Sequence, residues 1–207
     1  ICRRSWGISV LVASAPAAAR GSRVAAEVIS TNRNSLPREL KLSCRSAEQY
    51  SVTAEAMGKL EPATLSWGNG KATFAVNRRS NKEAEVPMLR EQGLLKGPHD
   101  FDAPVLAVKS SDGKLKATVF GYACHTTTLS FYQFSGDYAG FAQIELEKAY
   151  PGAQAMFFAG CGADQNPLPR RTVELAQNYG TQLADAVDAV LKNPLQPVSP
   201  KLQTEIE

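Results

Sequence analysis

Alternating and periodic hydrophobic positions divide the chain into predicted strands and helices that are joined by polar turns. Apolar residues recur with helical spacing from Pro37 to Leu60, where Gly58 marks the end of the predicted helix. The same spacing returns after a Thr172 cap and continues to Lys192, where Asn193-Pro194 stops it. Short apolar or alternating runs predict strands at residues 8–13, 63–67, 72–76, 105–109, 117–124 and 155–159.

Two glycine-containing turns predict hairpins. Gly68-Asn69-Gly70 would join strand 63–67 to strand 72–76, and Asp112-Gly113 would join strand 105–109 to strand 117–124. The polar segment 81–98 between them has no clear period and is predicted to be a surface loop.

The stretch from Phe120 to Pro167 predicts a βαβ unit. Strand 117–124 leads to His125, a helix follows from about Tyr138 to Tyr150, and strand 155–159 runs into the polar loop Gly160–Pro167. Such loops open at the carboxyl edge of an α/β sheet, where ligands usually bind. The sequence therefore predicts an α/β fold with a mixed β-sheet covered by helices, and a candidate site at this edge.

Composition and charge limit the possible classes of function. The 207 residues are 43% hydrophobic and 21% charged, which is ordinary for a globular domain with one core. A net charge of +3, evenly spread, gives no reason to expect a nucleic-acid partner. No segment approaches the roughly 20 apolar residues of a transmembrane helix. We predict one domain over residues 1–194 and a proline-rich linker, or the start of a further segment, over 195–207; the oligomeric state is not determined by the sequence.

The N-terminal residues have two readings. Ile1 rather than Met predicts a fragment or a processed chain. Arg3 and Arg4 before the apolar run WGISVLVASAPAAA fit a secretory signal, whereas residues 8–13 followed by Ala15-Pro16 fit a buried strand and a loop.

The cysteines and histidines restrict the metal sites that the chain could form. None of the four cysteines forms a CxxC pair, and Cys124 and Cys161 are predicted to be buried small residues rather than nucleophiles. Only two histidines occur. His99 lies among acidic residues and is predicted to be a surface residue, so a metal site at His125 would need carboxylates, tyrosine or another chain.

The candidate chemistry lies at the ends of the central strands. His125, beside the hydroxyls of residues 126–128, suits a metal ligand or a general base. Asp137 is predicted to cap the helix that follows it. The basic pair in Asn77-Arg78-Arg79 is either a solvated strand end or a clamp for an anion or substrate.

The loop Gly160–Pro167 is the more specific signal. Gly160 and Gly162 would let the backbone approach a ligand, while Asp164, Gln165 and Asn166 supply hydrogen-bond donors and acceptors at the end of a strand. We therefore predict a binding or catalytic site in this loop.

The order and spacing of these elements resemble the N-terminal catalytic domain of the neutral/alkaline, non-lysosomal ceramidase family. The similar elements cover roughly residues 60–170. They are Asn77-Arg78-Arg79, the strand and loop 119–129 with its histidine, the segment SGDYAGFA at 135–142, and the glycine-rich loop with Asp164.

The resemblance implies a zinc-dependent amidase that splits the N-acyl bond of ceramide into sphingosine and a fatty acid. His125 would match a zinc-binding histidine and Arg78 an arginine near the substrate. Asp164 would match the aspartate of a Gly-Asp-x-Ser-Pro-Asn loop whose serine is the proposed nucleophile. The resemblance also implies a location outside the cytoplasm, secreted or periplasmic.

The chain departs from the family pattern at three places. Asn166 stands where the family has serine, and an amide cannot form an acyl-enzyme. Ala15-Pro16-Ala17-Ala18 occupies the place of a Thr-His-Thr-His loop that carries another zinc ligand, and the remaining glutamate and tyrosine ligands would lie beyond Glu207. The resemblance therefore implies a Zn²⁺ site that is weak or incomplete in this chain.

Together these observations predict a ceramidase-like hydrolase that cleaves an amide in N-acylsphingosine or a related small-molecule or lipid substrate with the help of zinc. Asp164 and Asn166 would position water or the carbonyl, Arg78 and Gly162 would contact the substrate, and His125 would bind the metal. The alternative is a catalytically degenerate relative that binds a lipid, a glycan or a protein. We expect weak or no activity from residues 1–207 alone.

Overall fold

The computed structural model describes residues 54–199, which fall into two compact units. Residues 67–107 and 117–196 form one unit, which holds all the candidate site residues. The other contains residues 54–66, 108–116 and 197–199. The predicted strand 8–13, the secretory signal and most of the helix predicted from Pro37 lie outside the described residues, although residues 54–58 are helical and end at Gly58 as expected.

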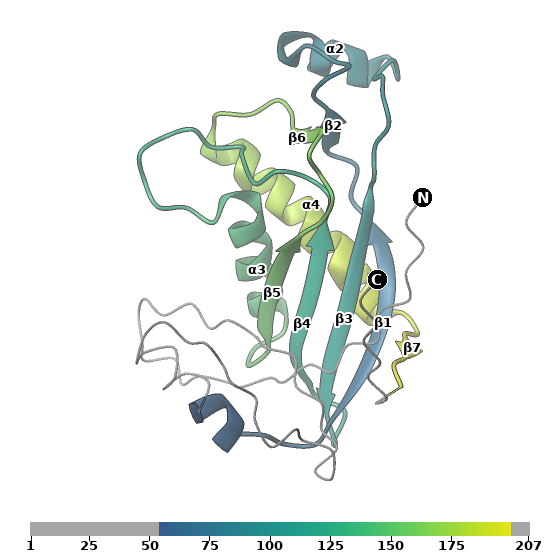
Figure 1. The fold of residues 1–207 in the computed structure, drawn as a ribbon, viewed down its shortest axis with the longest axis vertical. Coiled ribbons are helices and arrows are strands. Elements are labelled where there is room, and N and C mark those ends of the chain that lie inside the picture. Colours follow the sequence, from purple (N-terminus) through teal and green to yellow (C-terminus); the bar gives the residue numbers. More distant parts are fainter. Residues whose placement is uncertain (1–53, 200–207) are drawn as a thin grey trace, which may run out of the picture. The chain divides into compact units, whose positions relative to one another are not determined.

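A five-stranded sheet has the order β5-β4-β3-β1-β7, and a second sheet pairs β2 with β6 (Figure 1). The strands of the larger sheet are β1 Ala63–Lys71, β3 Asp102–Ser110, β4 Leu115–Tyr122, β5 Gln154–Ala159 and β7 Gln196–Pro197. β4 and β5 are parallel, with Phe120 beside Phe157, and helix α3 (Asp137–Ala149) connects them. The predicted βαβ unit and the predicted mixed α/β sheet are therefore confirmed.

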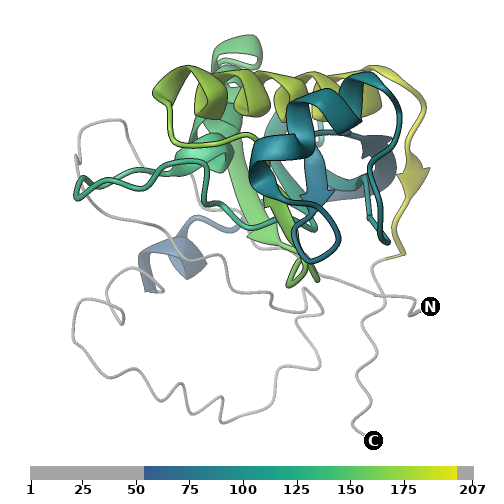
Figure 2. The same ribbon diagram turned by 90° about the horizontal axis from the view of Figure 1, so that it is seen from above.

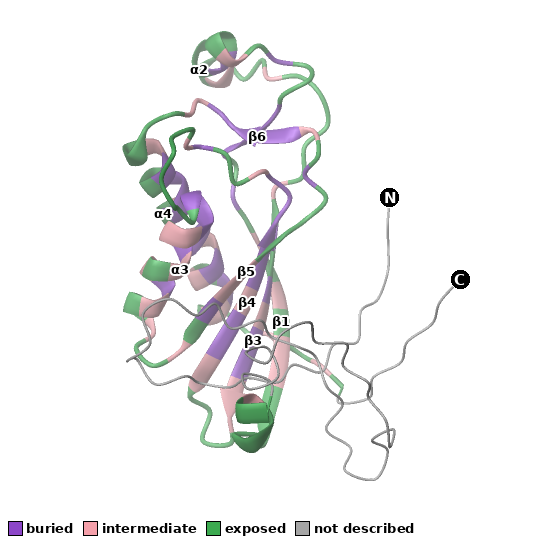
Figure 3. Cartoon of the chain, turned by 60° about the vertical axis from the view of Figure 1, so that its left-hand side comes forward, coloured by how far each residue is buried: buried purple, intermediate pink, exposed green. Residues whose placement is uncertain are grey.

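Helices α3 and α4 (Val173–Lys192) lie on one face of the sheet (Figures 2 and 3). They approach each other at Gly180, where a Cβ atom would lie 2.5 Å from Cβ of Phe141. Beneath them the Phe74 ring stacks on Tyr179 at 4.8 Å and contacts two further tyrosine rings. At the start of β3 buried residues alternate with exposed ones from Asp102 to Val105, as expected for a strand with one covered face, whereas the neighbouring Ala107 and Val108 are both buried. None of the helices in residues 54–199 is long and apolar enough to cross a membrane.

Local signals placed the ends of α4 correctly. Oγ1 of Thr172 accepts a hydrogen bond of 3.2 Å from the N–H of Leu175, which satisfies a free donor of the first helical turn. The helix ends at Asn193, as the Asn-Pro pair predicts. The predicted Asp-Gly hairpin is also confirmed, with Gly113 at a φ of 83° and the N–H of Ser110 bonded to the carbonyl of Lys114.

The hairpin predicted at Gly68-Asn69-Gly70 is wrong, because β1 runs through all three residues as one strand. The glycines are explained by α4 instead. A Cβ at Gly68 would lie 2.7 Å from Cγ1 of Val190, and one at Gly70 would lie 2.7 Å from the carbonyl oxygen of Ala186. Residues without a side chain are therefore needed here for close helix packing rather than for a turn.

The strand predicted at 72–76 is displaced and has a different partner. β2 (Ala75–Asn77) pairs antiparallel with the distant β6 (Gln165–Pro167), with Val76 opposite Asn166. Burial decides this pairing, because all six residues of the two strands are buried.

The surface loop predicted at 81–98 is also wrong in part. It contains the 3-10 turn η1 (Glu83–Glu85) and the helix α2 (Val86–Glu91), which begins with a proline near its first position. Val86 is buried against Val76 and Leu168. One apolar anchor of this kind carries too little periodicity to reveal a helix in the sequence.

Candidate functional site

The β2–β6 pair joins the basic segment after β2 to the glycine-rich loop after β5. The N–H of Arg78 donates to the carbonyl of Asp164 at 2.8 Å, which continues the ladder beyond Asn77. Nδ2 of Asn77 donates to Oδ2 of Asp164, also at 2.8 Å. Two predicted site residues, 86 positions apart in the sequence, are therefore neighbours in the fold.

The carbonyl oxygen of Ala163 is the point at which the predicted residues meet. Arg78 donates to it from Nε at 3.2 Å and from Nη2 at 3.0 Å. Nε2 of His125 lies 3.4 Å from the same oxygen, and the N–H of His125 donates to the carbonyl of Gln165 at 3.1 Å. The guanidinium of Arg78 is exposed and the imidazole of His125 is half-buried, so both can be reached from solvent.

Asn77 organises the segment that carries Arg78. Its Oδ1 accepts from the N–H groups of Arg79 and Ser80, and its Nδ2 also donates to the carbonyl of Pro98 at 3.0 Å. Because the side chain of Asn77 is buried, its hydrogen bonds fix the conformation of the turn that carries Arg78 and Arg79. The sequence pattern did not predict this role of Asn77, although a polar residue directly after the apolar Ala75-Val76 was the available signal.

Gln165 is a second organising residue, and its specific role did not follow from the sequence. Its Oε1 accepts from the N–H of Asp100 at 3.0 Å, and its Nε2 donates to the carbonyl of Ala123 at the end of β4. The buried amide thus ties the glycine-rich loop to the strand that leads to His125.

Asn166 lies on β6 and is 5% exposed. Its Oδ1 is buried and has no hydrogen-bond partner among the described residues. An unpaired buried amide oxygen is costly, so it is an acceptor for an enclosed water molecule.

Gly162 is buried for a reason that lies within the chain. A Cβ atom there would lie 2.5 Å from the carbonyl carbon of Ala123 and 2.5 Å from the nitrogen of Cys124. The close approach of these two backbones accounts for the glycine without a ligand.

The two cysteines at the strand ends differ. Cys124 is buried as predicted, and burial raises the pKa of its thiol. Cys161 is exposed, so the prediction for it is wrong; it follows the end of β5, where the sheet no longer covers the chain.

Asp137 is the first residue of α3 and not its N-cap residue, but its carboxylate still accepts a hydrogen bond from the first helical turn. Its Oδ1 accepts from the N–H of Tyr138 at 2.8 Å, and its Oδ2 accepts from the N–H of Leu129 at 2.8 Å. Gly136 occupies the cap position and makes no side-chain contact. The carboxylate therefore holds the loop that follows His125 as well as the helix.

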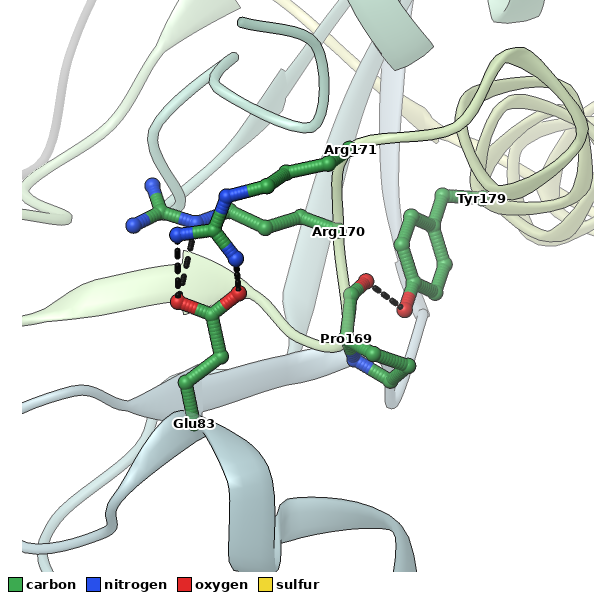
Figure 4. Close-up of polar contacts among 5 residues, drawn as sticks. All are labelled: Glu83, Pro169, Arg170, Arg171 and Tyr179. Atoms are coloured by element: carbon green, nitrogen blue, oxygen red, sulfur yellow. Dashed lines mark hydrogen bonds and ion pairs between the residues drawn. The ribbon is translucent and has the colours of Figure 1, made fainter.

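Ion pairs hold the segment that follows β6 in the chain (Figure 4). The carboxylate of Glu83 accepts hydrogen bonds from both Arg170 and Arg171, which connects η1 to the segment before α4. The hydroxyl of Tyr179 donates to the carbonyl of Pro169 at 2.6 Å, and burial raises the pKa of Tyr179 to about 12. These contacts hold the segment that continues from Asn166.

The donor groups of the described residues decide whether they can form a metal site. Within residues 54–199 no group of three or more histidine, cysteine, aspartate or glutamate side chains could hold a metal ion. A zinc ion at His125 would need ligands from elsewhere, so the residues that are described do not fit a zinc site on their own.

Comparison with known proteins identifies the fold. No family model and no curated protein matches the chain. Among solved structures, a ceramidase complexed with C2 matches with a TM-score of 0.54 and 16% identity, over 67% of this chain and 23% of that one. The neutral ceramidase from Pseudomonas aeruginosa matches with a TM-score of 0.53 and 16% identity, over 69% of this chain and 25% of that one.

The chain therefore has the fold of part of a neutral ceramidase, as the resemblance predicted. It spans about a quarter of the length of these structures. At this level of identity the likeness concerns the fold and leaves the chemistry to be argued from the residues.

Proposed function

We propose that this chain is part of a hydrolase that cleaves an amide bond, with N-acylsphingosine or a related lipid amide as the substrate class. The observation that carries the proposal is the meeting of Arg78 and His125 at the Ala163 carbonyl, with Asp164 next along the chain and bonded to Asn77, beyond the carboxyl ends of the parallel strands β4 and β5 in a ceramidase-like fold. Ligand sites of α/β folds lie at this edge.

Arg78 is proposed to bind developing negative charge. Two of its N–H donors are held by a neutral carbonyl, which orients the guanidinium without neutralising it. Its other donors can bind the oxyanion that forms when an amide carbonyl is attacked.

Asp164 and Asn166 are proposed to position the attacking water. Both present oxygen acceptors, and that of Asn166 has no partner among the described residues. In the reaction, the water oxygen bonds to the carbonyl carbon, the C–N bond breaks, and the leaving nitrogen takes a proton. Because an asparagine stands at the position of the family's serine, we propose direct attack by water rather than an acyl-enzyme.

His125 is proposed to bind zinc together with ligands from outside residues 54–199. When bound, zinc would polarise the carbonyl or lower the pKa of a water molecule. We further propose that the protein is secreted or periplasmic, in line with the family that the sequence resembles.

The second candidate is a binding domain that has lost catalysis. The observation that favours it is Asn166, which can hold a carbonyl or an N–H group but cannot act as a nucleophile. Such a domain would bind a lipid, a glycan or a protein at the same residues.

The test begins with zinc content and zinc affinity of the chain, of His125→Ala and of His99→Ala. His99 is the matched control, because it is the only other histidine and is exposed. Because the described residues supply one ligand, we expect weak binding that is lost only in His125→Ala, whereas binding at micromolar concentration or tighter would show that further ligands lie within the chain. Equal binding by all three proteins would refute the role of His125.

The second step is hydrolysis of N-acylsphingosines with short and long acyl chains, compared between the chain and Arg78→Gln. We expect slow release of free amine that falls at least tenfold in the variant, since one oxyanion donor contributes about 100-fold or more in related chemistry. Substrate binding without any release of amine would favour the binding domain instead.

A further inference from the structure

An aromatic loop, residues 130–136, stands out from the surface between β4 and α3. Three of the eleven large hydrophobic side chains exposed in the described residues lie within four positions here. Tyr132 and Phe134 are fully exposed, and Phe131 is 41% exposed. Two perpendicular views show this loop projecting beyond the helices (Figures 1 and 2). Clustered exposed aromatics of this kind mark an interaction surface.

The ends of the aromatic loop are held together by Asp137. Its carboxylate accepts from the N–H of Leu129 before the loop, and its own N–H donates to Oγ of Ser135 within it, at 2.8 and 3.0 Å. Asp137 is only 6% exposed and has a φ of 53°, a conformation that costs energy for a residue with a side chain. The loop is therefore a closed unit that displays its rings, rather than a loose connection.

The chemistry of the aromatic loop fits a lipid surface better than a protein groove. No charged residue occurs between His125 and Asp137, so the tip can enter an apolar layer without burying charge. Phenylalanine and tyrosine rings partition into the interface of a bilayer, where the tyrosine hydroxyl reaches the headgroups.

The base of the aromatic loop presents an arginine to the solvent. The N–H of Arg171 donates to the carbonyl of Thr128 at 2.6 Å, which fixes Arg170 and Arg171 beside the loop. Two carboxylates lie near these guanidinium groups: that of Glu83, which pairs with both, and that of Asp137, which bonds the N–H of Leu129. The side chain of Arg171 is 56% exposed, against 27% for Glu83, and Asp137 is buried, so the arginine is the group that faces the solvent. Positive charge behind an apolar tip complements the anionic headgroups of a lipid surface.

We propose that the aromatic loop docks the protein on the surface of a lipid bilayer, with the rings of Phe131, Tyr132 and Phe134 in the interface. The inference rests on the proposed function in one respect, since a long-chain lipid amide is held in such bilayers. The partner is recognised by its apolar layer first and by its anionic headgroups second.

The test is cosedimentation of the whole chain with vesicles of phosphatidylcholine, with and without phosphatidylserine. The loop variant is Tyr132→Ser with Phe134→Ser. The matched control is Met88→Ser with Ile144→Ser, which removes two exposed apolar side chains elsewhere on the same unit. All four side chains are exposed, so both variants should keep the fold, which their melting temperatures would verify.

We expect the loop variant to bind vesicles at least tenfold more weakly than wild type, about the effect of removing two partly buried rings. The control variant should bind vesicles as tightly as wild type. Phosphatidylserine should strengthen the vesicle binding of wild type and of the control variant. Equal binding by loop variant and control would overturn the proposal. A second outcome would also overturn the proposal: wild type binds no vesicles, but self-associates in sedimentation velocity, and the loop variant does not self-associate.

Failure of the loop and failure of the proposed function are distinguishable. Vesicle binding through the loop without amide hydrolysis would refute the enzyme and leave the docking surface. Hydrolysis of soluble short-chain amides without vesicle binding would refute the docking surface and leave the enzyme.

Discussion

Replacing Gly70 by alanine should destabilise the fold, because β1 has no room for a side chain beneath α4. A Cβ atom at this position would lie 2.7 Å from the carbonyl oxygen of Ala186 and 2.9 Å from Cγ2 of Val190. Val190 can change its rotamer, but the carbonyl belongs to the helix backbone. Relief of the contact therefore requires the helix or the strand to move.

The expected cost follows from overpacking in a well-packed core. Shifts of this kind cost about 1–3 kcal/mol, a large part of the roughly 5–15 kcal/mol that stabilises a domain. Gly140→Ala is the matched control, because Gly140 lies inside α3 and a Cβ there would meet nothing within 4 Å. Alanine in a helix interior is favoured over glycine by about 1 kcal/mol, so the control should be stabilised.

The assay is urea unfolding of the three proteins, with melting temperatures as a second measure. At about 2–4 °C per kcal/mol for a protein of this size, the two variants should lie on opposite sides of wild type. The m-value should stay constant if only the native packing changes. A Gly70→Ala protein as stable as wild type would refute the close approach of α4 to β1 and would favour the turn that the glycine pattern predicts.

Three further predictions concern the side chains of Glu83, Tyr138 and Tyr179. Glu83→Gln should lower the free energy of unfolding by about 1 kcal/mol, since it weakens a half-exposed ion-pair network with two arginines. Glu85→Gln, at an exposed residue, should lower it by less than about 0.5 kcal/mol. Equal losses of the two variants in urea unfolding would contradict this. Tyr138→Phe should cost about 1–2 kcal/mol by leaving a buried carbonyl without its 2.7 Å donor, and an unchanged unfolding midpoint would refute that contact. Stability should fall as the pH rises from 10 towards 12, because burial raises the pKa of Tyr179 from 10.0 to about 12 and the unfolded chain loses its proton first. The pKa of Tyr150 is also raised to about 12, so Tyr179→Phe should make this slope shallower without removing it, and an unaltered slope would exclude the contribution of Tyr179.

Part of the candidate site followed from the sequence alone. His125 and the loop after residue 159 were placed at the ends of neighbouring strands because β4, α3 and β5 each have a local hydrophobic pattern. The proximity of Arg78 to Asp164 was not predictable in this way. It depends on the pairing of two three-residue strands, Ala75–Asn77 and Gln165–Pro167, whose paired residues are 88 to 92 positions apart.

What the sequence by itself determined is the local structure: the βαβ unit, the Asp-Gly hairpin and the cap and stop of α4. Each depends on residues within a few positions of one another, so a propensity or a capping bond is sufficient. Only the tertiary structure decided the role of Gly68 and Gly70, the partner of β2, and the meeting of the site residues at Ala163. A glycine serves a turn and a close helix contact equally well, and the difference lies in a helix more than a hundred residues further along the chain.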